Sequence, residues 1–239
     1  MVPRFYVDAP LRAGGVCNLS EDAAHHAVHV LRLREQDEVT LFNGRGGEYA
    51  ARIASMQRLR ISIDVLQHRA IERESPLRVT LVQGVSAGEK MDSTVRKAVE
   101  LGVAVIQPVL AVRSVARPKG ERADTRRTHW QRVVIAASEQ CGRNRIAEVL
   151  PLLALADYRP GPGTKILLSP RAERSLSKVA LDAGDLIVAA GPEAGFTAEE
   201  EAALAGAGFV PASLGPRVLR TETAAVAALS ALNALRGDS

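Results

Sequence analysis

The stretch DLIVAAGPEAGFTAEEEAAL (185–204) decides the fold class. It begins with a continuous apolar run, turns at a glycine-rich segment and continues into a helical pattern. Thr197 and Glu200 have the spacing of a capping box, which predicts the first turn of that helix. Similar apolar runs of strand length are RVTLVQG (78–84), VAVIQPVL (103–110), TKILLSP (164–170) and GFVPASLGP (208–216). Because helical patterns separate these runs, we predict a parallel sheet covered on both faces.

The N-terminal part of the chain has a different pattern, with short strands and tight turns. EVTLF (38–42) and EYAARIA (48–54) flank NGRGG (43–47), which favours a hairpin because glycine accepts positive φ. Apolar and polar residues alternate over 59–65, as in a strand with one buried face. This pattern predicts a small β-barrel.

The two patterns meet in the polar segment HRAIERESP (68–76), which ends in a proline-containing turn. We therefore expect two domains, a β-barrel over residues 1–72 and an α/β domain over residues 73–239.

The composition of the 239-residue chain, with 46% hydrophobic residues and a net charge of +4, is that of a globular protein and excludes a disordered or fibrous one. Two cysteines exclude a disulfide framework and a four-cysteine zinc site. MVPRFYVDAP (1–10) is too polar for a signal peptide, and the most apolar stretch, 224–235, is too short to span a bilayer. We expect a soluble, cytoplasmic protein that does not contact membranes.

Positive charge is concentrated between residues 113 and 145. Only Glu121, Asp124 and Glu139 oppose the basic residues there, which are Arg113, Arg117, Lys119, Arg122, Arg126, Arg127, Arg132, Arg143 and Arg145. Arginine suits bidentate phosphate contacts and stacking on bases, so this block indicates a nucleic-acid partner. The alternative is a solvated helix face that only aids solubility.

Three segments stand at the ends of predicted strands: LLSPRA (167–172), GPEAGF (191–196) and LGPRVLRTET (214–223), of which the last two contain glycine. In open α/β sheets, ligands bind at the carboxyl ends of the strands, so these loops can hold a nucleotide-like cofactor through backbone groups. Neither the dinucleotide nor the P-loop fingerprint is present. Ordinary β–α turns are the alternative interpretation.

A further polar cluster, SEQCGRNR (138–145), closes the long helix predicted before it. Its amides and arginines can contact RNA, and Glu139 can accept a proton; helix capping by the arginines is the alternative. His25 and His29 have i, i+4 spacing, but no third ligand accompanies them, so we expect no metal site.

Several of these segments together resemble a known family. HHAVHVLRLR (25–34), GEKMD (88–92) with KAVELG (97–102), EQCGRNR (139–145), GPEAGF and LGPRVLRTETA (214–224) occur in this order in the bacterial 16S ribosomal-RNA uridine-N3 methyltransferases. The resemblance implies an N-terminal PUA-like β-barrel that recognises RNA and a C-terminal SPOUT-class α/β methyltransferase domain. It further implies a deep C-terminal trefoil knot, a homodimer, S-adenosylmethionine as cofactor, and 16S rRNA or the small ribosomal subunit as substrate.

The resemblance also assigns roles to residues. The cofactor is expected to contact the three strand-end loops, through Leu168, Ser169, Gly191, Pro192, Glu193, Gly195, Leu214, Gly215, Leu219 and Thr221. Where the family usually has GPEGGF, this chain has Ala194 in place of the second glycine, and we expect altered loop packing without loss of binding.

For the reaction, the uridine must present N3 to the methyl group and lose the N3 proton. Glu139 is the first candidate for the base and Glu222 the second, with Arg143 or Arg220 stabilising charge on the uracil oxygens. The residues expected to contact RNA are Arg113, Arg117, Lys119, Arg122, Arg126, Arg127, Asn144 and Arg145.

Two other classes remain open at this point: an RNA-binding ribosome-assembly factor that does not methylate, and a SPOUT methyltransferase that acts on another RNA. Cofactor binding distinguishes the first of these, and the product nucleoside distinguishes the second. A nicotinamide oxidoreductase is disfavoured because its fingerprint is missing.

Overall fold

The computed structural model describes residues 2–58, 60–181 and 184–237. The chain forms two compact units. The first comprises Met1–Glu74 together with Ser138–Ile146, and the second comprises Ser75–Ala137 and Ala147–Ser239. The segment 138–146 therefore belongs with the N-terminal residues, although it lies far from them in the sequence.

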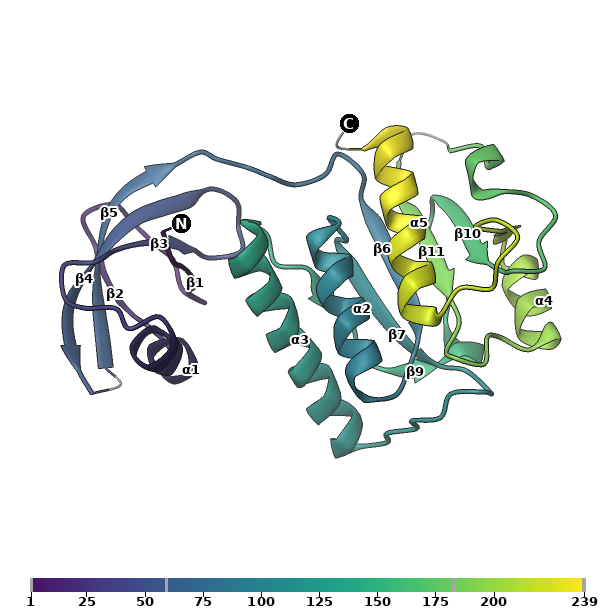
Figure 1. Cartoon of the computed structure of the whole chain (residues 1–239), viewed down its shortest axis with the longest axis horizontal. Helices are drawn as coiled ribbons and strands as arrows, with labels where there is room; N and C mark the ends of the chain where they lie inside the picture. Colours follow the sequence, from purple (N-terminus) through teal and green to yellow (C-terminus); the bar gives the residue numbers. More distant parts are fainter. Residues whose placement is uncertain (1, 59, 182–183, 238–239) are drawn as a thin grey trace. The chain divides into compact units, whose positions relative to one another are not determined.

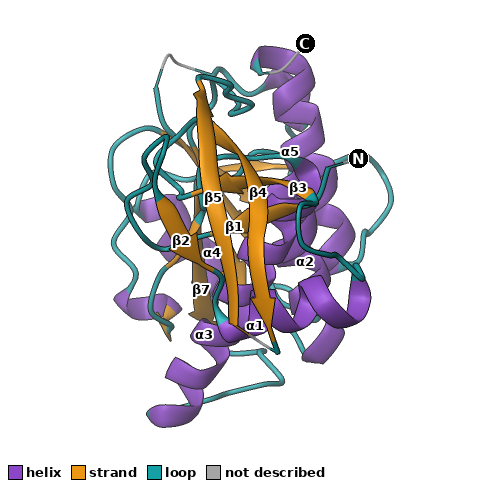
Figure 2. Cartoon of the chain, turned by 90° about the vertical axis from the view of Figure 1, so that its left-hand side faces the viewer, coloured by secondary structure: helices purple, strands orange, loops and turns teal. Residues whose placement is uncertain are grey.

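A curled five-stranded sheet in the order β1-β3-β4-β5-β2 forms the first unit. The strands β2 to β5 pair antiparallel, and β1 is parallel to β3. Their bounds are β1 (Arg4–Tyr6), β2 (Val16–Asn18), β3 (Glu38–Phe42), β4 (Glu48–Gln57) and β5 (Arg60–Arg69). Figure 2 looks onto the long β4 and β5 strands, whose register shifts twice, and such irregularities bend a sheet.

Side chains on one face of this sheet form the core of the first unit. Ile61, Ile63 and Val65 are buried while Arg60 and Asp64 are exposed, which confirms the predicted alternation over the described part of 59–65; Leu59 lies outside the described residues. The predicted turn at 43–47 is also confirmed, because its three glycines all have positive φ.

A short helix follows Ser20 in the first unit. The Ser20 Oγ accepts a hydrogen bond from the Ala23 N–H and caps α1 (Glu21–His25), which continues as the π-helical turn η1 (His26–Val30). Ala24 and Ala27 from this segment are buried against the sheet.

A seven-stranded parallel sheet, in the order β12-β10-β11-β6-β7-β8 with β9 beside β7, forms the second unit. Its strands are β6 (Val79–Gly84), β7 (Val105–Leu110), β8 (Glu148–Val149), β9 (Leu153–Ala154), β10 (Thr164–Leu168), β11 (Leu186–Ala190) and β12 (Val210–Ala212). The helices are α2 (Gly88–Glu100), α3 (Glu121–Cys141), α4 (Ala198–Gly206) and α5 (Thr221–Arg236), with 3-10 turns η2 (Leu155–Asp157) and η3 (Leu176–Lys178).

Helices cover this sheet as the sequence predicts. Figure 1 shows α2 and α5 side by side in front of β6 and β11, and both helices bury an apolar stripe. Leu204 of α4 packs with residues that point to the other face, including Val82 and Ile187. The capping box at Thr197 and Glu200 is present, and α5 ends before Gly237.

From the sequence alone, Asp92 or Ser93 is the expected N-cap of α2, because their side chains are typical helix caps. The helix begins upstream of both residues, at Gly88, and the methyl side chain of its N-cap residue, Ala87, cannot accept a hydrogen bond. The Glu193 carboxylate instead accepts the Ala87 N–H at 2.9 Å. A distant residue thus takes over the role of a local cap, and no local sequence pattern reveals this.

None of the helices in the described part of the chain combines the length and the apolarity needed to cross a bilayer.

Candidate functional site at the ends of the parallel strands

Four loops lie at the carboxyl edge of the parallel sheet, because each follows a strand of the same direction. They follow β6, β10, β11 and β12, and the last one leads into α5. Three of them are the strand-end loops predicted from the sequence: loop 1 (169–172) after β10, loop 2 (191–196) after β11 and loop 3 (213–220) after β12.

Glycine allows the end of β6 and loop 2 to approach each other closely. A Cβ placed on Gly84 would lie 2.5 Å from both the N and the Cδ of Pro192. A Cβ on Gly191 would lie 2.9 Å from the Phe196 nitrogen, and Gly195 has a φ of +69°. The backbone of loop 2 is therefore fixed by contacts that only glycine permits.

A small cavity of about 60 Å³ lies between loop 1 and loop 3. Its wall is mostly apolar, and Arg217 is the charged residue in it; the lining is Leu168, Ser169, Pro170, Ala212, Leu214, Arg217, Leu219 and Ala224. Four predicted cofactor residues, Leu168, Ser169, Leu214 and Leu219, are thus brought together. Beside Gly215, at a φ of +104°, a Cβ would meet no atom within 4 Å, so the rim is open there.

The chemistry of this wall suits a nucleoside and a thioether more than a polyphosphate, because apolar side chains and backbone groups dominate it. The Ser169 hydroxyl is held by Glu201 of α4, to whose carboxylate oxygens it donates at 3.2 and 3.3 Å. Arg171 pairs with the same carboxylate at 3.0 Å. Ser169 and Arg171 therefore hold loop 1 against α4 through Glu201.

Glu193, a predicted cofactor residue, joins loop 2 to α2. In addition to accepting the Ala87 N–H, its Oε1 lies 3.6 Å from the Lys90 Nζ. Burial alone would raise the pKa of Glu193, but the Ala87 N–H and Lys90 outweigh it and hold the pKa below its usual value. Its Oε2 is buried without a hydrogen-bond partner.

Ala194, which replaces the usual second glycine of loop 2, is compatible with this backbone. Among the described residues other than glycine, positive φ occurs at Arg32, Gln36 and Arg58, so Ala194 adopts a conformation open to any residue. Its side chain is exposed, and its carbonyl accepts a hydrogen bond from Arg113 at 3.1 Å. The effect of the alanine on cofactor binding stays a prediction.

Loop 3 is anchored where it enters α5. Thr221 is buried, and its hydroxyl donates to the Gly191 carbonyl at 2.6 Å. Gln83, at the end of β6, donates to the Thr221 hydroxyl at 3.1 Å. Gln83 is not among the site residues expected from the sequence, although a glutamine inside the apolar run RVTLVQG is an available signal.

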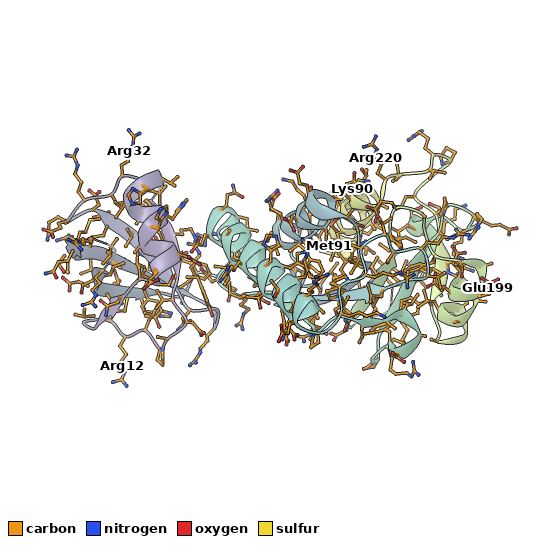
Figure 3. All side chains as sticks on the ribbon, turned by 90° about the horizontal axis from the view of Figure 1, so that it is seen from below. Arg12, Arg32, Lys90, Met91, Glu199 and Arg220 are labelled. Carbon is orange, nitrogen blue, oxygen red and sulfur yellow. The ribbon has the colours of Figure 1, made fainter. Side chains whose placement is uncertain are left out.

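Two predicted catalytic residues flank Thr221. Arg220 is exposed, and its side chain projects away from the ribbon in Figure 3. For comparison, the labelled Met91 of α2 is enclosed among interior side chains. Glu222 is half-buried in the first turn of α5, and its Oε2 is buried without a hydrogen-bond partner.

The segment 138–146 belongs to the first unit and is held there by charged partners, a different setting from the strand-end loops. Arg143 is buried, and its Nε lies 3.0 and 3.2 Å from the Glu74 carboxylate oxygens. The Asn144 amide is fully buried, accepts from Arg4 at 2.6 Å and donates to the Ile71 carbonyl at 2.7 Å. Both side chains form internal hydrogen bonds, and the catalytic role of Arg143 and the RNA contact of Asn144 stay predictions.

Glu139 also belongs to the first unit. Its Oε1 accepts the Tyr6 N–H at 2.9 Å, and burial raises its pKa despite this bond and the nearby Arg4. Arg145 is exposed and pairs with Glu72 at 3.2 Å.

The basic residues before position 138 lie in the second unit. Arg117 donates to the Ser114 and Ala111 carbonyls at 3.2 and 3.0 Å, and Arg127 donates to the Val149 carbonyl at 2.9 Å. Lys119, Arg122 and Arg126 are exposed and line, with Arg117, an open groove beside the start of α3. These three side chains keep their charged groups available for a partner.

His25 and His29 lie with their ring centres 4.4 Å apart. Within the described ranges, no group of three or more His, Cys, Asp or Glu residues is placed so that it could hold a metal ion.

A parallel α/β sheet with open loops at its carboxyl edge places this protein in the class of α/β proteins that bind ligands at the ends of their strands. Comparison with known proteins narrows this class. The RNA methyltransferase domain family matches residues 73–233, and the RNA methyltransferase PUA domain family matches residues 19–66.

Whole-chain relatives agree with both matches. The Ribosomal RNA small subunit methyltransferase E of Buchnera aphidicola subsp. Schizaphis graminum is 33% identical and covers 99% of this chain and 98% of its own. The crystal structure of the Neisseria gonorrhoeae enzyme of that name, bound to S-adenosylmethionine, has a TM-score of 0.92 and 38% identity, covering 100% of this chain and 99% of that one. A Legionella pneumophila protein solved with the same cofactor has a TM-score of 0.96 and 36% identity, with 100% of both chains covered.

The chain therefore belongs to the RNA methyltransferase family whose curated members are the ribosomal RNA small subunit methyltransferases E. Its first unit is a PUA-like curled sheet and its second a SPOUT-type parallel α/β domain.

Proposed function

We propose that this protein transfers the methyl group of S-adenosylmethionine to N3 of a uridine in 16S rRNA, and that it acts in the cytoplasm on the small ribosomal subunit. The observation that carries the proposal is the set of glycine-dependent loops at the carboxyl edge of the sheet, in a chain of this family. The deep trefoil knot and the homodimer implied by the resemblance are parts of the proposal.

The cofactor would be held by the walls of loops 1 and 3 and by the backbone of loop 2. Leu168, Leu214 and Leu219 provide apolar surface, and Gly191, Gly195 and Gly215 leave the backbone accessible. When bound, S-adenosylmethionine supplies a methyl group on a positively charged sulfur, which a nucleophilic nitrogen can attack. Glu193 and Thr221 act on this site indirectly, since their hydrogen bonds to Ala87 and to the Gly191 carbonyl hold the loops in position.

The uracil N3 proton has to be removed, and Glu222 is our proposed acceptor. Its carboxylate follows Thr221 directly, in the same unit as the loops, and its Oε2 has no hydrogen-bond partner. Glu139 is the first candidate from the sequence. One observation supports it, because burial raises its pKa and a higher pKa makes its carboxylate a stronger base. The two are separated by experiment below.

Arg220 is the proposed stabiliser of negative charge on the uracil oxygens, since it is exposed at the end of loop 3 and Arg143 is committed to Glu74. Lys119, Arg122 and Arg126 are proposed to bind rRNA phosphates, with the PUA-like unit recognising RNA shape.

The proposal is tested by incubating the protein with S-adenosylmethionine and small subunits that lack the modification, followed by nucleoside mass spectrometry. Appearance of 3-methyluridine supports it. Cofactor binding without any methylated nucleoside would transfer the substrate assignment to another RNA, and absence of cofactor binding would favour an assembly factor.

The catalytic roles are tested in the same assay. We expect Glu222→Gln to lower single-turnover methylation by about a hundredfold, as loss of a general base does, with cofactor affinity retained. If Glu139→Gln shows that loss instead, Glu139 is the base. Arg220→Ala is expected to reduce methyl transfer far more than rRNA affinity, and equal losses in both would refute a catalytic role.

A further inference from the structure

Gln83 connects three segments that the sequence separates widely. Its side chain is fully buried at the end of β6. The Nε2 group lies 3.0 Å from the Gly84 carbonyl, 3.1 Å from the Thr221 hydroxyl and 3.3 Å from the Gly191 carbonyl. One amide thus contacts its own strand, the first residue of loop 2 and the first residue of α5.

The direction of these hydrogen bonds is fixed by the chemistry of the partners. Thr221 has one hydroxyl hydrogen, which it donates to the Gly191 carbonyl, so its oxygen accepts from Gln83. A flipped Gln83 amide would set its oxygen against two carbonyl oxygens. The observed orientation leaves the Gln83 Oε1 buried without a hydrogen-bond partner.

Such an unpaired acceptor is unfavourable by itself, because it loses its bonds to water and gains none. A methionine would fill similar space without that cost. The carbonyls that Gln83 contacts would also keep other donors, since Thr221 donates to Gly191 and the Ser86 hydroxyl donates to Gly84 at 3.4 Å. Stability of the fold is therefore a weak reason for glutamine at this position.

Loop 3 depends on its ends for its position. In the part of the chain that the structure describes, residues 215–218 make no hydrogen bond or ion pair and are exposed. The bonds from Thr221 to Gly191 and Gln83 fix the end of loop 3 against the start of loop 2. Both loops form the proposed cofactor site.

We propose that Gln83 is a positioning residue for S-adenosylmethionine: through Thr221 and the Gly191 carbonyl, it sets the separation of loops 2 and 3. This inference rests on the proposed function, because it assigns to Gln83 a role in the binding of that cofactor. Gln83 itself does not contact the cofactor, since its side chain is enclosed.

Gln107 on the neighbouring strand β7 provides a matched control. It is buried, and its Nε2 also donates to the carbonyl of the next residue, Pro108, at 2.9 Å. Its second bond, at 2.8 Å, goes to the Pro151 carbonyl instead of a site loop. Both glutamines are buried, and both donate a hydrogen bond to the carbonyl of the following residue. They differ in the distant partner, which is Thr221 and the Gly191 carbonyl for Gln83 and the Pro151 carbonyl for Gln107.

The test is calorimetric titration of the full-length protein with S-adenosylmethionine, together with thermal unfolding. For Gln83→Met we expect affinity to fall by about tenfold, the effect of losing one well-placed hydrogen bond, with an unchanged or higher Tm. Gln107→Met is expected to keep wild-type affinity. Equal affinity of Gln83→Met and wild type, or equal losses for both glutamine variants, would overturn the inference.

A second pair of variants covers the case in which Gln83→Met does not fold. Thr221→Val removes the hydroxyl and is expected to weaken S-adenosylmethionine binding as Gln83→Met does. Thr221→Ser keeps the hydroxyl and is expected to keep the wild-type affinity. Equal binding by the valine and serine variants would refute the inference. Failure of the wild-type protein itself to bind S-adenosylmethionine would overturn the proposed function, which separates the two failures.

Discussion

The first unit contains a cluster of charged side chains that are almost completely buried: those of Arg4, Glu48 and Arg143 are 8%, 6% and 5% exposed, and each is paired with an opposite charge. In the second unit, the buried polar cluster at the site is neutral and consists of Gln83, Thr221 and the Gly191 carbonyl. Removing one partner from a buried charged cluster lowers the stability of the folded protein strongly, because the other charge stays buried without a partner. A neutral cluster can lose a member at little cost in stability and still lose its geometry.

The largest expected effect comes from breaking the charged cluster. Arg143→Ala leaves the Glu74 carboxylate without its buried partner and should lower the free energy of unfolding by about 3 kcal/mol, measured by urea unfolding. The control is Arg145→Ala, whose side chain is 57% exposed beside Glu72, and which should cost less than about 0.5 kcal/mol. Similar losses in the two variants would show that burial does not distinguish these pairs.

A smaller effect is expected from steric change in the second unit. Gly84→Ala places a methyl group 2.5 Å from Pro192, so the strand end or loop 2 must shift, at a cost of about 2 kcal/mol. S-adenosylmethionine affinity should fall with it, because loop 2 belongs to the site. Gly206→Ala is the control, since no atom outside the neighbouring residues of its own helix lies within 4 Å of its Cβ position. It should bind like wild type and be equally stable or slightly more stable. An unperturbed Gly84→Ala variant would mean that the close approach is not required.

Sequence patterns predicted the elements whose causes are local. The capping box of Thr197 with Glu200 spans three residues, and the turn at 43–47 needs only its own glycines. The parallel sheet and the grouping of the three strand-end loops follow from strand polarity, so they too could be predicted, whereas Leu168, Leu214 and Leu219 within these loops were expected from the family resemblance.

Contacts between distant segments could not be predicted in this way. The partner of Arg143 lies 69 residues away at Glu74, the group that caps α2 lies 106 residues from Ala87, and Thr221 is 138 residues from Gln83. The polar run EQCGRNR has the composition of a catalytic or RNA-binding segment. Its Arg143 and Asn144 are also buried and form internal bonds, and the sequence does not show which charges meet there.

The smallest expected effect is a difference in pH dependence between the clusters. Burial would raise the pKa of Glu48, but hydrogen bonds from Arg4 and Arg73 outweigh it and lower the pKa. The folded state therefore holds this proton less tightly than the unfolded state. The stabilisation from Glu48 is complete above the unfolded pKa and is lost as the pH falls through the folded one.

Glu139 has the opposite sign, because burial raises its pKa in the folded state. Its contribution is most favourable below the unfolded pKa and declines as the pH rises through the folded value. Glu139→Gln keeps an oxygen for the Tyr6 N–H and removes the charge, so it should raise Tm near neutral pH. Glu48→Gln should lower Tm there and reduce the loss of stability in acid.

Thermal unfolding from about pH 4 to about pH 8 measures both slopes. Gln83→Met serves as the neutral reference, and its Tm difference from wild type should be constant over this range because no member of its cluster titrates. A pH-dependent difference for Gln83→Met would remove the contrast between the charged and neutral clusters. The Tm of Glu139→Gln minus the Tm of wild type should become smaller as the pH falls. If it becomes larger, the Glu139 carboxyl is stabilised in its ionised form, against the effect of its burial.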